Sequence, residues 1–407
     1  MPTVPSSPDH RQHSSAWSIF LVFLRLGLTS FGGPVAHLGY FREEFVNRRR
    51  WLDEARYADL VALCQFLPGP ASSQVGIAIG LQRGGYRGSL AAWTGFTLPS
   101  AIALTLFALG IANWGEAVPD GFLHGLKIVA VAVVAQAVWG MACNLCTDGT
   151  RITLALLAAC AVLLLPNAWA QLGVIALAGV AGLLLFRPAM KATETPIQPP
   201  RGRSSASLFL LLFFGLLMAL PALAAATTNH WLALLDTFYR AGALVFGGGH
   251  VVLPLLQAEV VPNGWVSNDT FLAGYGAAQA VPGPLFTFSA FLGGSMGGGL
   301  SVSLASAAVC LIAVFIPSFL LVFGVMPFWD RLRANGQVQS ALVGVNAAVV
   351  GLLLAALYDP VWTSAIFSPT DFALALIALV ALMFWKLPPW LVVLVGGFAG
   401  WTLAVLF

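Results

Sequence analysis

Residues 64–74 read CQFLPGPASSQ, and residues 279–286 read QAVPGPLF. Each segment places a Pro-Gly-Pro turn three residues after a glutamine, inside an otherwise apolar run. Proline removes a helical hydrogen-bond donor and glycine permits positive φ values, so each turn predicts a break in a helix. Because the same turn occurs in both halves of the chain, the two segments also predict an internal repeat.

The repeat extends far beyond the turns. Residues of the first half recur 214 to 219 positions later, in the same order. The pairs are Arg25 and Arg240, Gly27 and Gly242, Phe31 and Phe246, Gly32 and Gly247, Gly33 and Gly248, Leu38 and Leu253, Glu44 and Glu259, Trp51 and Trp265, Gly80 and Gly294, Pro99 and Pro317, Ser100 and Ser318, and Gly125 and Gly344. The sequence therefore predicts a duplication that spans nearly the whole chain.

The composition is that of an integral membrane protein. Of 407 residues, 59% are hydrophobic and 9% are charged, whereas about a quarter of a soluble domain is charged. The mean hydropathy is +0.87. The net charge of +3 is too small to suggest nucleic acid as a partner. No GxxxxGK[ST] segment is present, so we expect no ATP site on this chain.

The apolar runs divide the chain into five expected parts. If each half crosses the bilayer an even number of times, a single connecting helix delivers the second half in the opposite orientation. We therefore predict an all-α polytopic membrane protein with an inverted-topology repeat and broken or re-entrant helices. The parts are a disordered cytoplasmic tail at 1–16, a first repeat at 17–186, a cytoplasmic linker at 187–206, a connecting transmembrane helix at 207–227 and a second repeat at 228–407.

The arginines favour hairpins over full spans for some of these runs. Five arginines lie within residues 42–56. If every run crosses the bilayer and the basic linker is cytoplasmic, these arginines lie outside, against the positive-inside rule. Hairpins that return to the side they came from keep them cytoplasmic and leave nine spans, with kinked full spans as the alternative. The predicted hairpins are 17–46, 55–80, 231–256 and 268–296.

The residues after each Pro-Gly-Pro turn are expected to begin a half-helix. The free N–H groups and the positive dipole end of such a helix favour an anion. Ser72, Ser73, Thr287 and Ser289 would add hydroxyl donors. Broken helices in both halves of a transporter are also the best sequence indication of its binding site. A kink that serves packing alone is the alternative.

Arg25 and Arg240 are the most informative charges, since an arginine inside an apolar segment costs at least about 2.5 kcal/mol and needs a partner. Two guanidinium groups can neutralise a tetrahedral dianion. Equally, each arginine can pair with the glutamate of its own half, Glu44 or Glu259. His250 follows a glycine cluster and is a candidate proton carrier near neutral pH, or a structural histidine.

Four segments resemble the paired signature motifs of the chromate transporter family in its long, two-domain form. They are FGGPVAHLGYFREEFVNRRRW (31–51), CQFLPGPASSQ (64–74), FGGGHVVLPLL (246–256) and QAVPGPLF (279–286). The resemblance covers about residues 17–407. It implies a multi-pass protein of the bacterial inner membrane that exports chromate and confers chromate resistance, with sulfate as a similar competitor. Thr287 stands where relatives are expected to have asparagine.

By this resemblance and by position, we expect substrate to bind at the two turns, the paired glycines, the glutamines and the arginines. The substrate-binding candidates are Arg25, Gly32, Gly33, Gln65, Pro68, Gly69, Pro70, Ser72, Ser73, Arg240, Gly247, Gly248, Gln279, Pro282, Gly283, Pro284 and Thr287. The candidates for proton coupling are Glu44, His250 and Glu259.

The expected activity is secondary transport rather than catalysis. An interior-negative potential of about 150 mV assists an outgoing dianion by roughly 7 kcal/mol, so we expect chromate efflux by alternating access, with a proton exchanged in some schemes. The alternative is a sulfate transporter or a chromate/sulfate exchanger. A chromate reductase would need haem, flavin or metal ligands, and the chain offers no paired helical histidines. We therefore expect no cofactor, and leave a homodimer open.

Overall fold

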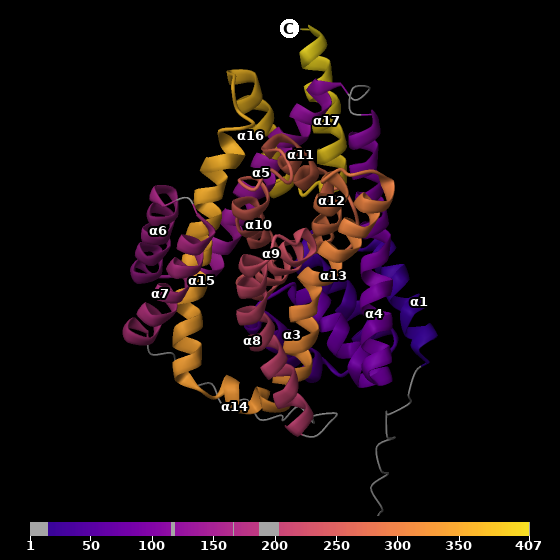
Figure 1. Ribbon diagram of the computed structural model, residues 1–407, viewed down its shortest axis with the longest axis vertical. Helices are drawn as coiled ribbons and strands as arrows, with labels where there is room; N and C mark the ends of the chain where they lie inside the picture. The colour runs from indigo at the N-terminus through magenta and orange to yellow at the C-terminus, as the bar shows by residue number, and fades with distance from the viewer. Residues whose placement is uncertain (1–14, 115–118, 166, 187–202, 407) are drawn as a thin grey trace, which may run out of the picture.

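The computed structural model describes residues 15–114, 119–165, 167–186 and 203–406. Most of the predicted tail at 1–16 and of the predicted linker at 187–206 lies outside these residues. Every regular element within them is a helix, which confirms the all-α fold (Figure 1). The α-helices are α1 (Ala16–Thr29), α2 (Gly33–Arg42), α3 (Glu54–Phe66), α4 (Ala71–Trp114), α5 (Asp120–Leu145), α6 (Gly149–Leu164), α7 (Ala168–Leu185), α8 (Arg203–Ala226), α9 (His230–Leu244), α10 (Val252–Val260), α11 (Asn268–Ala278), α12 (Phe288–Ser295), α13 (Leu300–Val325), α14 (Trp329–Arg333), α15 (Gly336–Ala356), α16 (Pro369–Met383) and α17 (Pro389–Leu406). Short 3₁₀ or π segments are η1 (Glu43–Arg48), η3 (Gly249–Val251), η4 (Leu285–Thr287), η5 (Met326–Phe328) and η6 (Leu357–Trp362).

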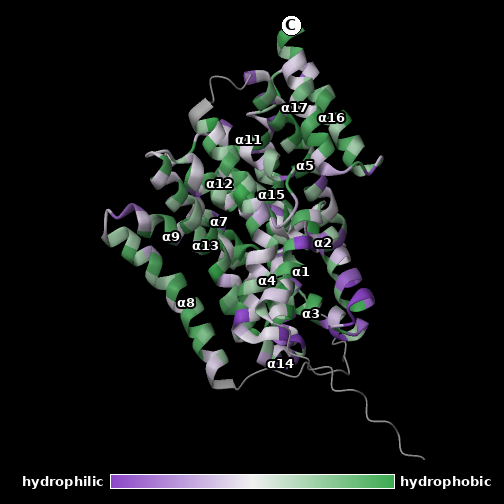
Figure 2. Ribbon diagram, turned by 90° about the vertical axis from the view of Figure 1, so that its right-hand side faces the viewer, coloured by the Kyte–Doolittle hydropathy of each residue, from purple (hydrophilic) through white to green (hydrophobic). Residues whose placement is uncertain are grey.

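The helices have the length and composition of a multi-pass membrane protein. Among the described residues, six helices are long and apolar enough to cross a bilayer. Figure 2 shows the hydrophobic residues along them, most clearly along α8. The six are Ala71–Ala112, Asp120–Leu145, Ser205–Ala226, Leu300–Arg333, Gly336–Trp362 and Pro389–Leu406.

Helices break at all four predicted glycine and proline motifs. In the first half, α1 ends before the glycine pair that starts α2, and α3 ends just before the first Pro-Gly-Pro turn. In the second half, α9 ends before the glycines that precede η3, and α11 ends before the second turn. The broken helices of the predicted fold class are therefore present in both halves.

The helix α4 reverses direction just past the end of the second predicted hairpin. Gly85 has a φ of 62° inside it. A methyl group placed on Gly80 would overlap the carbonyl oxygen of Gly88, although residues eight apart in a straight helix are separated by about 12 Å. Residues 71–83 therefore form a half-helix, and residues 86–114 form a long helix that runs back beside it.

The segment from α3 to this reversal starts and finishes at the same end of the molecule. In the first half of α3, Asp59 accepts a hydrogen bond of 2.7 Å from Arg333 of α14. Just past the reversal, the ring of Tyr86 packs on Phe323, close to the end of α13 that leads to α14, with centroids 4.8 Å apart. The segment thus has the shape of a re-entrant hairpin, and its depth in a bilayer stays a prediction.

Basic residues gather at this end. The guanidinium groups of Arg49 and Arg83 lie 5.5 and 5.0 Å from the ring centroid of Trp51, and Arg42 pairs with Glu54 at 2.7 Å. Figure 2 shows hydrophilic residues at this end of the molecule, near α14. These contacts gather Arg42, Arg49 and Arg83 at one end of the molecule, and the side of a membrane that this end faces stays a prediction.

The second half repeats the pattern of two returning segments. The ring of His230, at the start of α9, lies 5.6 Å from that of Trp265, just after α10, measured between centroids. A methyl group on Gly293 of α12 would overlap the carbonyl of Ser306 of α13. The chain therefore turns back after α9 and again after α12, as it does at the equivalent places of the first half.

The two halves also exchange their last helices. In the first half, α5 packs against α16 and α17, whereas α15 of the second half packs against α6 and α7 (Figure 1). Glycines allow these contacts: a methyl on Gly125 would overlap the carbonyl oxygen of Gly396, and one on Gly344 would overlap that of Ala178. Small residues let membrane helices approach in this way. The repeats are thus interlocked rather than side by side.

Candidate functional site

Each Pro-Gly-Pro turn is held by a hydrogen bond from the opposite half. The N–H of Gly69 donates to the carbonyl oxygen of Val245 over 2.7 Å, and the N–H of Gly283 donates to that of Ser30 over 3.0 Å. Val245 lies 215 positions after Ser30, the spacing of the sequence repeat, so the same contact is made twice. The turns therefore lie where the two halves meet.

A serine of the opposite half closes over each turn glycine. Gly69 has a φ of 117° and Gly283 one of 104°. A Cβ atom on Gly69 would lie 2.9 Å from Ser318 Oγ, and one on Gly283 would lie 2.8 Å from Ser100 Oγ. Both the backbone angle and the space require glycine here.

The first turn starts a half-helix with free donors. The first helical bond runs from the N–H of Gln74 to the carbonyl oxygen of Pro70 over 2.9 Å, so the N–H groups of Ala71, Ser72 and Ser73 precede any intrahelical acceptor. The side-chain amide of Gln74 donates to the carbonyl oxygen of Pro68 over 2.6 Å and fixes the turn. The positive end of the helix dipole is thus presented at the repeat interface.

His37 of α2 lies against this helix start. Its side chain is 1% exposed, and its Nδ1 lies 3.3 Å from Ser72 Oγ. If Nδ1 accepts the Ser72 hydroxyl proton, Nε2 carries the ring proton and is a donor. Within the described part of the chain, Ser73 Oγ has no hydrogen-bond partner, whereas the His37 ring also interacts with the backbone of Ser30. Buried polar groups are normally paired, so Ser73 Oγ points to a ligand that accepts a hydrogen bond.

Three further hydroxyls near the turns are also buried without a hydrogen-bond partner among the described residues. Ser30 and Ser318 flank the turns, and Thr97 lies one helical turn before Ser100. The hydroxyl oxygens of Ser30, Ser318 and Thr97 are buried without a partner among the residues described. Leaving a buried polar group unpaired costs about 1–3 kcal/mol, and a bound oxyanion would supply acceptors.

The second half-helix differs from the first. The hydroxyl of Thr287 already donates to the carbonyl oxygen of Pro284 over 2.7 Å, and that of Ser289 donates to the carbonyl oxygen of Phe286 over 2.7 Å. Our expectation that Thr287 and Ser289 offer free hydroxyl donors is wrong for this structure, because local carbonyls take both protons. The half-helix of the first repeat is the better equipped for an anion.

The helix breaks at Gly32–Gly33 and at Gly247–Gly248 lie close to the second Pro-Gly-Pro turn. Gly32 and Gly33 have φ values of 97° and 75°, and Gly247 and Gly248 have φ values of 75° and 148°. A Cβ atom on the neighbouring Gly249 would lie 3.4 Å from Pro34 and 3.8 Å from Phe286. The first break, its counterpart in the second half and the residues after the second turn therefore meet in one region.

The two repeat-related arginines are not brought together. Arg25 is exposed on the face of α1 that also carries the exposed Leu21 and Leu28, and the structure gives it no ion-pair partner among the described residues. Arg240 is 9% exposed and pairs with Asp236 and Glu259. The predicted clamp of two arginines is therefore wrong for this structure, because one guanidinium faces outward and carboxylates occupy the other.

The remaining candidate residues also lie in different surroundings in the two halves. Gln65 is exposed, whereas Gln279 is half-buried, with Nε2 unpartnered among the described residues. Glu44 lies among the basic residues and pairs with Arg48 and Arg49 at 3.1 and 2.6 Å. The Nδ1 atom of His250 lies 2.7 Å from the hydroxyl oxygen of Tyr275. Of the proton-coupling candidates, only Glu259 is next to Arg240.

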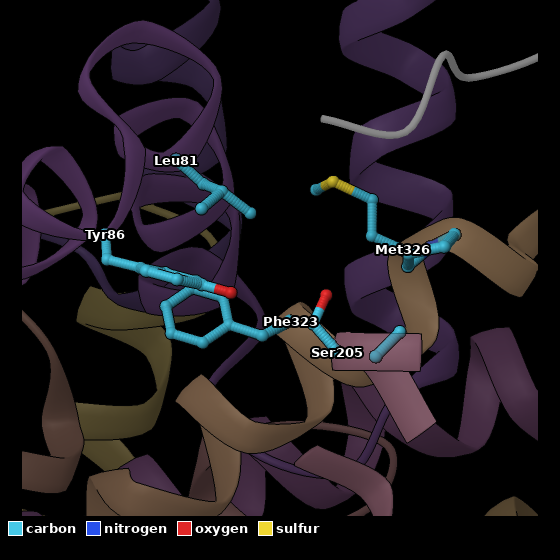
Figure 3. Close-up of a pocket in the computed structure, with 7 residues that line it drawn as sticks. Leu81, Tyr86, Ser205, Phe323 and Met326 are labelled. Atoms are coloured by element: carbon cyan, nitrogen blue, oxygen red, sulfur yellow. The ribbon is translucent and has the colours of Figure 1, made fainter. Parts of the chain in front are cut away.

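An apolar hollow lies between α4, α8 and the end of α13, away from the turns. Figure 3 shows Leu81 and Tyr86 on one side of it and Met326 on the other, with Phe323 and Ser205 below. Its volume is about 290 Å³. Its lining contains no charged side chain, so its chemistry does not match an oxyanion.

Two residues that contact the candidate sites, His37 and Asp236, were not among the predicted site residues. His37 stands inside the quoted motif FGGPVAHLGYF, but its contact with Ser72 depends on how α2 folds against α4. Asp236 lies one helical turn before Arg240, a spacing typical of an ion pair on one helix face. That spacing was visible in the sequence. No cluster of three or more metal-ligating side chains occurs in the part of the chain that the structure describes.

Broken helices that meet at the interface of two repeats are characteristic of secondary transporters. A profile of the chromate transporter family matches residues 17–183 and again 232–401, once in each half. The chain belongs to the chromate transporter family.

Curated relatives cover most of this chain. A chromate transport protein of Pseudomonas aeruginosa is 30% identical, covering 94% of this chain and 91% of its own length. A probable chromate transport protein of Synechococcus elongatus is 30% identical, covering 93% of each. An uncharacterized transporter of Methanocaldococcus jannaschii is 29% identical, covering 85% of each. No solved structure matches the chain significantly.

Proposed function

We propose that this protein exports chromate across the bacterial inner membrane and so confers chromate resistance. The relatives named as chromate transport proteins support the substrate. Transport is secondary and proceeds by alternating access, with the membrane potential as its main driving force. The basic end, which holds Arg49, Arg83 and Arg333, is the cytoplasmic side in this proposal, in line with the positive-inside rule.

The observation that carries the proposal is the set of buried, unpaired donors at the start of α4. Chromate presents four oxygens in a tetrahedron. The N–H groups at the helix start and the hydroxyl of Ser73 can each donate to one of them. These donors are neutral, so the substrate keeps its charge, and the membrane potential can act on it. Binding by fixed dipoles and hydrogen bonds takes the place of the expected arginine clamp.

Contacts that join the halves at both ends support alternating access. At the basic end, Asp59 of the first half binds Arg333 of the second at 2.7 Å. Toward the other end, Lys127 of α5 binds Asp269 of α11 at 2.8 Å. In this proposal one contact opens while the other stays closed, and the turns remain near the centre. The reciprocal bonds of the two turns support the inverted arrangement of the repeats that such rocking requires.

The voltage dependence can be measured directly. In everted membrane vesicles, uptake of labelled chromate corresponds to export. We expect collapse of the membrane potential at constant pH gradient to slow initial uptake about tenfold or more, because two negative charges at about 150 mV are worth roughly 7 kcal/mol. Vesicles that lack the protein provide the background. Uptake that is indifferent to voltage would remove this mechanism.

Sulfate is the alternative substrate, since it is also a tetrahedral dianion, and the neutral donors of the helix start and of Ser73 do not distinguish the two by charge. Competition in the same vesicles separates the cases. If the protein is a sulfate transporter or exchanger, sulfate inhibits chromate uptake from one side and stimulates it from the other. A chromate exporter is inhibited by sulfate on the side from which chromate enters, but sulfate on the opposite side does not stimulate it.

A further inference from the structure

A second hollow, which is partly polar, lies between α7, α9 and α10. Its volume is about 270 Å³. Its polar lining consists of Gln171, Thr237, Arg240 and Glu259, and leucine and alanine side chains complete it. Neither Pro-Gly-Pro turn contributes to it, so it is distinct from the proposed chromate site.

The charges around this hollow disfavour an anion. Asp236 binds Arg240 with both oxygens, Oδ1 to Nε at 2.9 Å and Oδ2 to Nη2 at 2.6 Å. Glu259 binds Nη1 of Arg240 through Oε1 at 2.7 Å. The guanidinium carbon of Arg240 lies over the ring of Trp169, 5.5 Å from the centroid of that ring. With two carboxylates and one guanidinium the group carries one net negative charge, which repels chromate and attracts a cation.

Gln171 gives independent support for a ligand that donates a hydrogen bond. Its side chain is 6% exposed and lines the hollow, and its Oε1 has no hydrogen-bond partner in the described part of the chain. The carboxylate of Glu259 cannot satisfy this oxygen, since both are acceptors. A proton on Glu259 converts the carboxylate into a donor.

Other charges near the hollow are few. The helices α7, α13 and α15, which pack on α9 or α10, carry no Asp, Glu, Lys or Arg. On α11, Asp269 is paired with Lys127, and Tyr275 contacts His250. On α8, Arg203 lies ten residues, or about 15 Å of helix, before Phe213, whose carbonyl binds Tyr239. Glu259 is thus influenced mainly by Asp236 and Arg240.

We propose that Glu259 binds one proton in each transport cycle, on the oxygen that Arg240 does not engage, and that the resulting O–H group donates a hydrogen bond to Oε1 of Gln171. Asp236 engages the guanidinium with both oxygens, whereas Glu259 engages it through Oε1 alone and keeps its second oxygen available for a proton. The proton arrives from water, forms an O–H bond with the carboxylate, and leaves to water on the opposite side as chromate moves outward. This proposal rests on the proposed function and names the site of its coupling ion.

The first repeat lacks such a site. The positions equivalent to Asp236, Arg240 and Glu259 are Leu21, Arg25 and Glu44. Leucine replaces the aspartate, Arg25 is exposed, and Glu44 binds Arg48 and Arg49 instead. Coupling therefore belongs to the second half alone, whereas the better anion site belongs to the first.

Protonation of Glu259 can be observed without transport. Infrared difference spectra of the purified protein, recorded while the pH is lowered, should show a carboxylic acid band that is absent in Glu259→Gln and shifted in Gln171→Leu. The control Glu54→Gln removes an exposed carboxylate that also pairs with an arginine, and it should keep the band. An unchanged band in Glu259→Gln would overturn the assignment.

A transport assay tests the coupling itself. Proteoliposomes that contain a pH-sensitive dye report protons moved for each labelled chromate ion. We expect this ratio to fall about tenfold, to background, in Glu259→Gln, and to stay at the wild-type value in Glu54→Gln. An unchanged ratio in Glu259→Gln, or flux driven by a sodium gradient in place of a pH gradient, would contradict the proposal. Wild-type protein that moves no chromate would instead refute the proposed function, while the infrared result still decides the proton site.

Discussion

Gly69→Ala and Gly283→Ala are each expected to reduce chromate transport at least about tenfold. The φ values of 117° and 104° strain any other residue, by about 1–3 kcal/mol. The added methyl groups would also press on Ser318 and Ser100 of the opposite half, and the one on Gly69 would displace the Gln74 amide that fixes the turn. The hydrogen bonds that hold the turns across the repeat interface would lengthen, and the half-helix starts would shift.

A glycine in open space provides the matched control. Gly264 has a φ of 69°, and a Cβ atom on it would meet nothing within 4 Å. Gly264→Ala therefore introduces the backbone strain without the contact, and it should transport close to the wild-type rate. The measurement is labelled chromate uptake in vesicles with equal amounts of each protein. Wild-type rates in both turn variants would show that the turns do not position the substrate.

Arg240→Ala is expected to destabilise the protein by about 3–5 kcal/mol, because Asp236 and Glu259 would lose their buried counter-charge. The repeat-related Arg25→Ala should change stability by no more than about 0.5 kcal/mol, since that side chain is exposed. Thermal unfolding of the purified variants in one detergent compares them. Equal stability losses in the two variants would contradict the asymmetry seen here.

The sequence identified the breaks because the residues that cause them act locally. Pro68 and Pro282 end helices wherever they stand, and the spacing of 214 residues between them predicted that the two turns are related. Their mutual docking was not predictable, since the bonds from Gly69 to Val245 and from Gly283 to Ser30 join segments far apart in the chain. The exchange of α6 and α7 for α16 and α17 is a long-range choice of the same kind.

The error about the arginines has a specific cause. Sequence alignment of the repeats treats Arg25 and Arg240 as equivalent, but their neighbours decide their environments. Asp236 stands one turn before Arg240, whereas Leu21 stands one turn before Arg25. The first context favours a buried ion pair and the second an exposed face. His37 was missed for the opposite reason, because only the folded contact with Ser72 distinguishes it from a structural histidine.

Binding of labelled chromate to the purified protein tests most directly whether the start of α4 receives the substrate. A hydrogen bond to a charged ligand is worth about 1.5–3 kcal/mol, so Ser73→Ala should weaken binding about tenfold or more. Ser289→Ala is the matched control, because that equally buried hydroxyl already donates to Phe286. Weaker binding in Ser73→Ala alone is the predicted result, and equal affinity in both variants and the wild type would contradict the account.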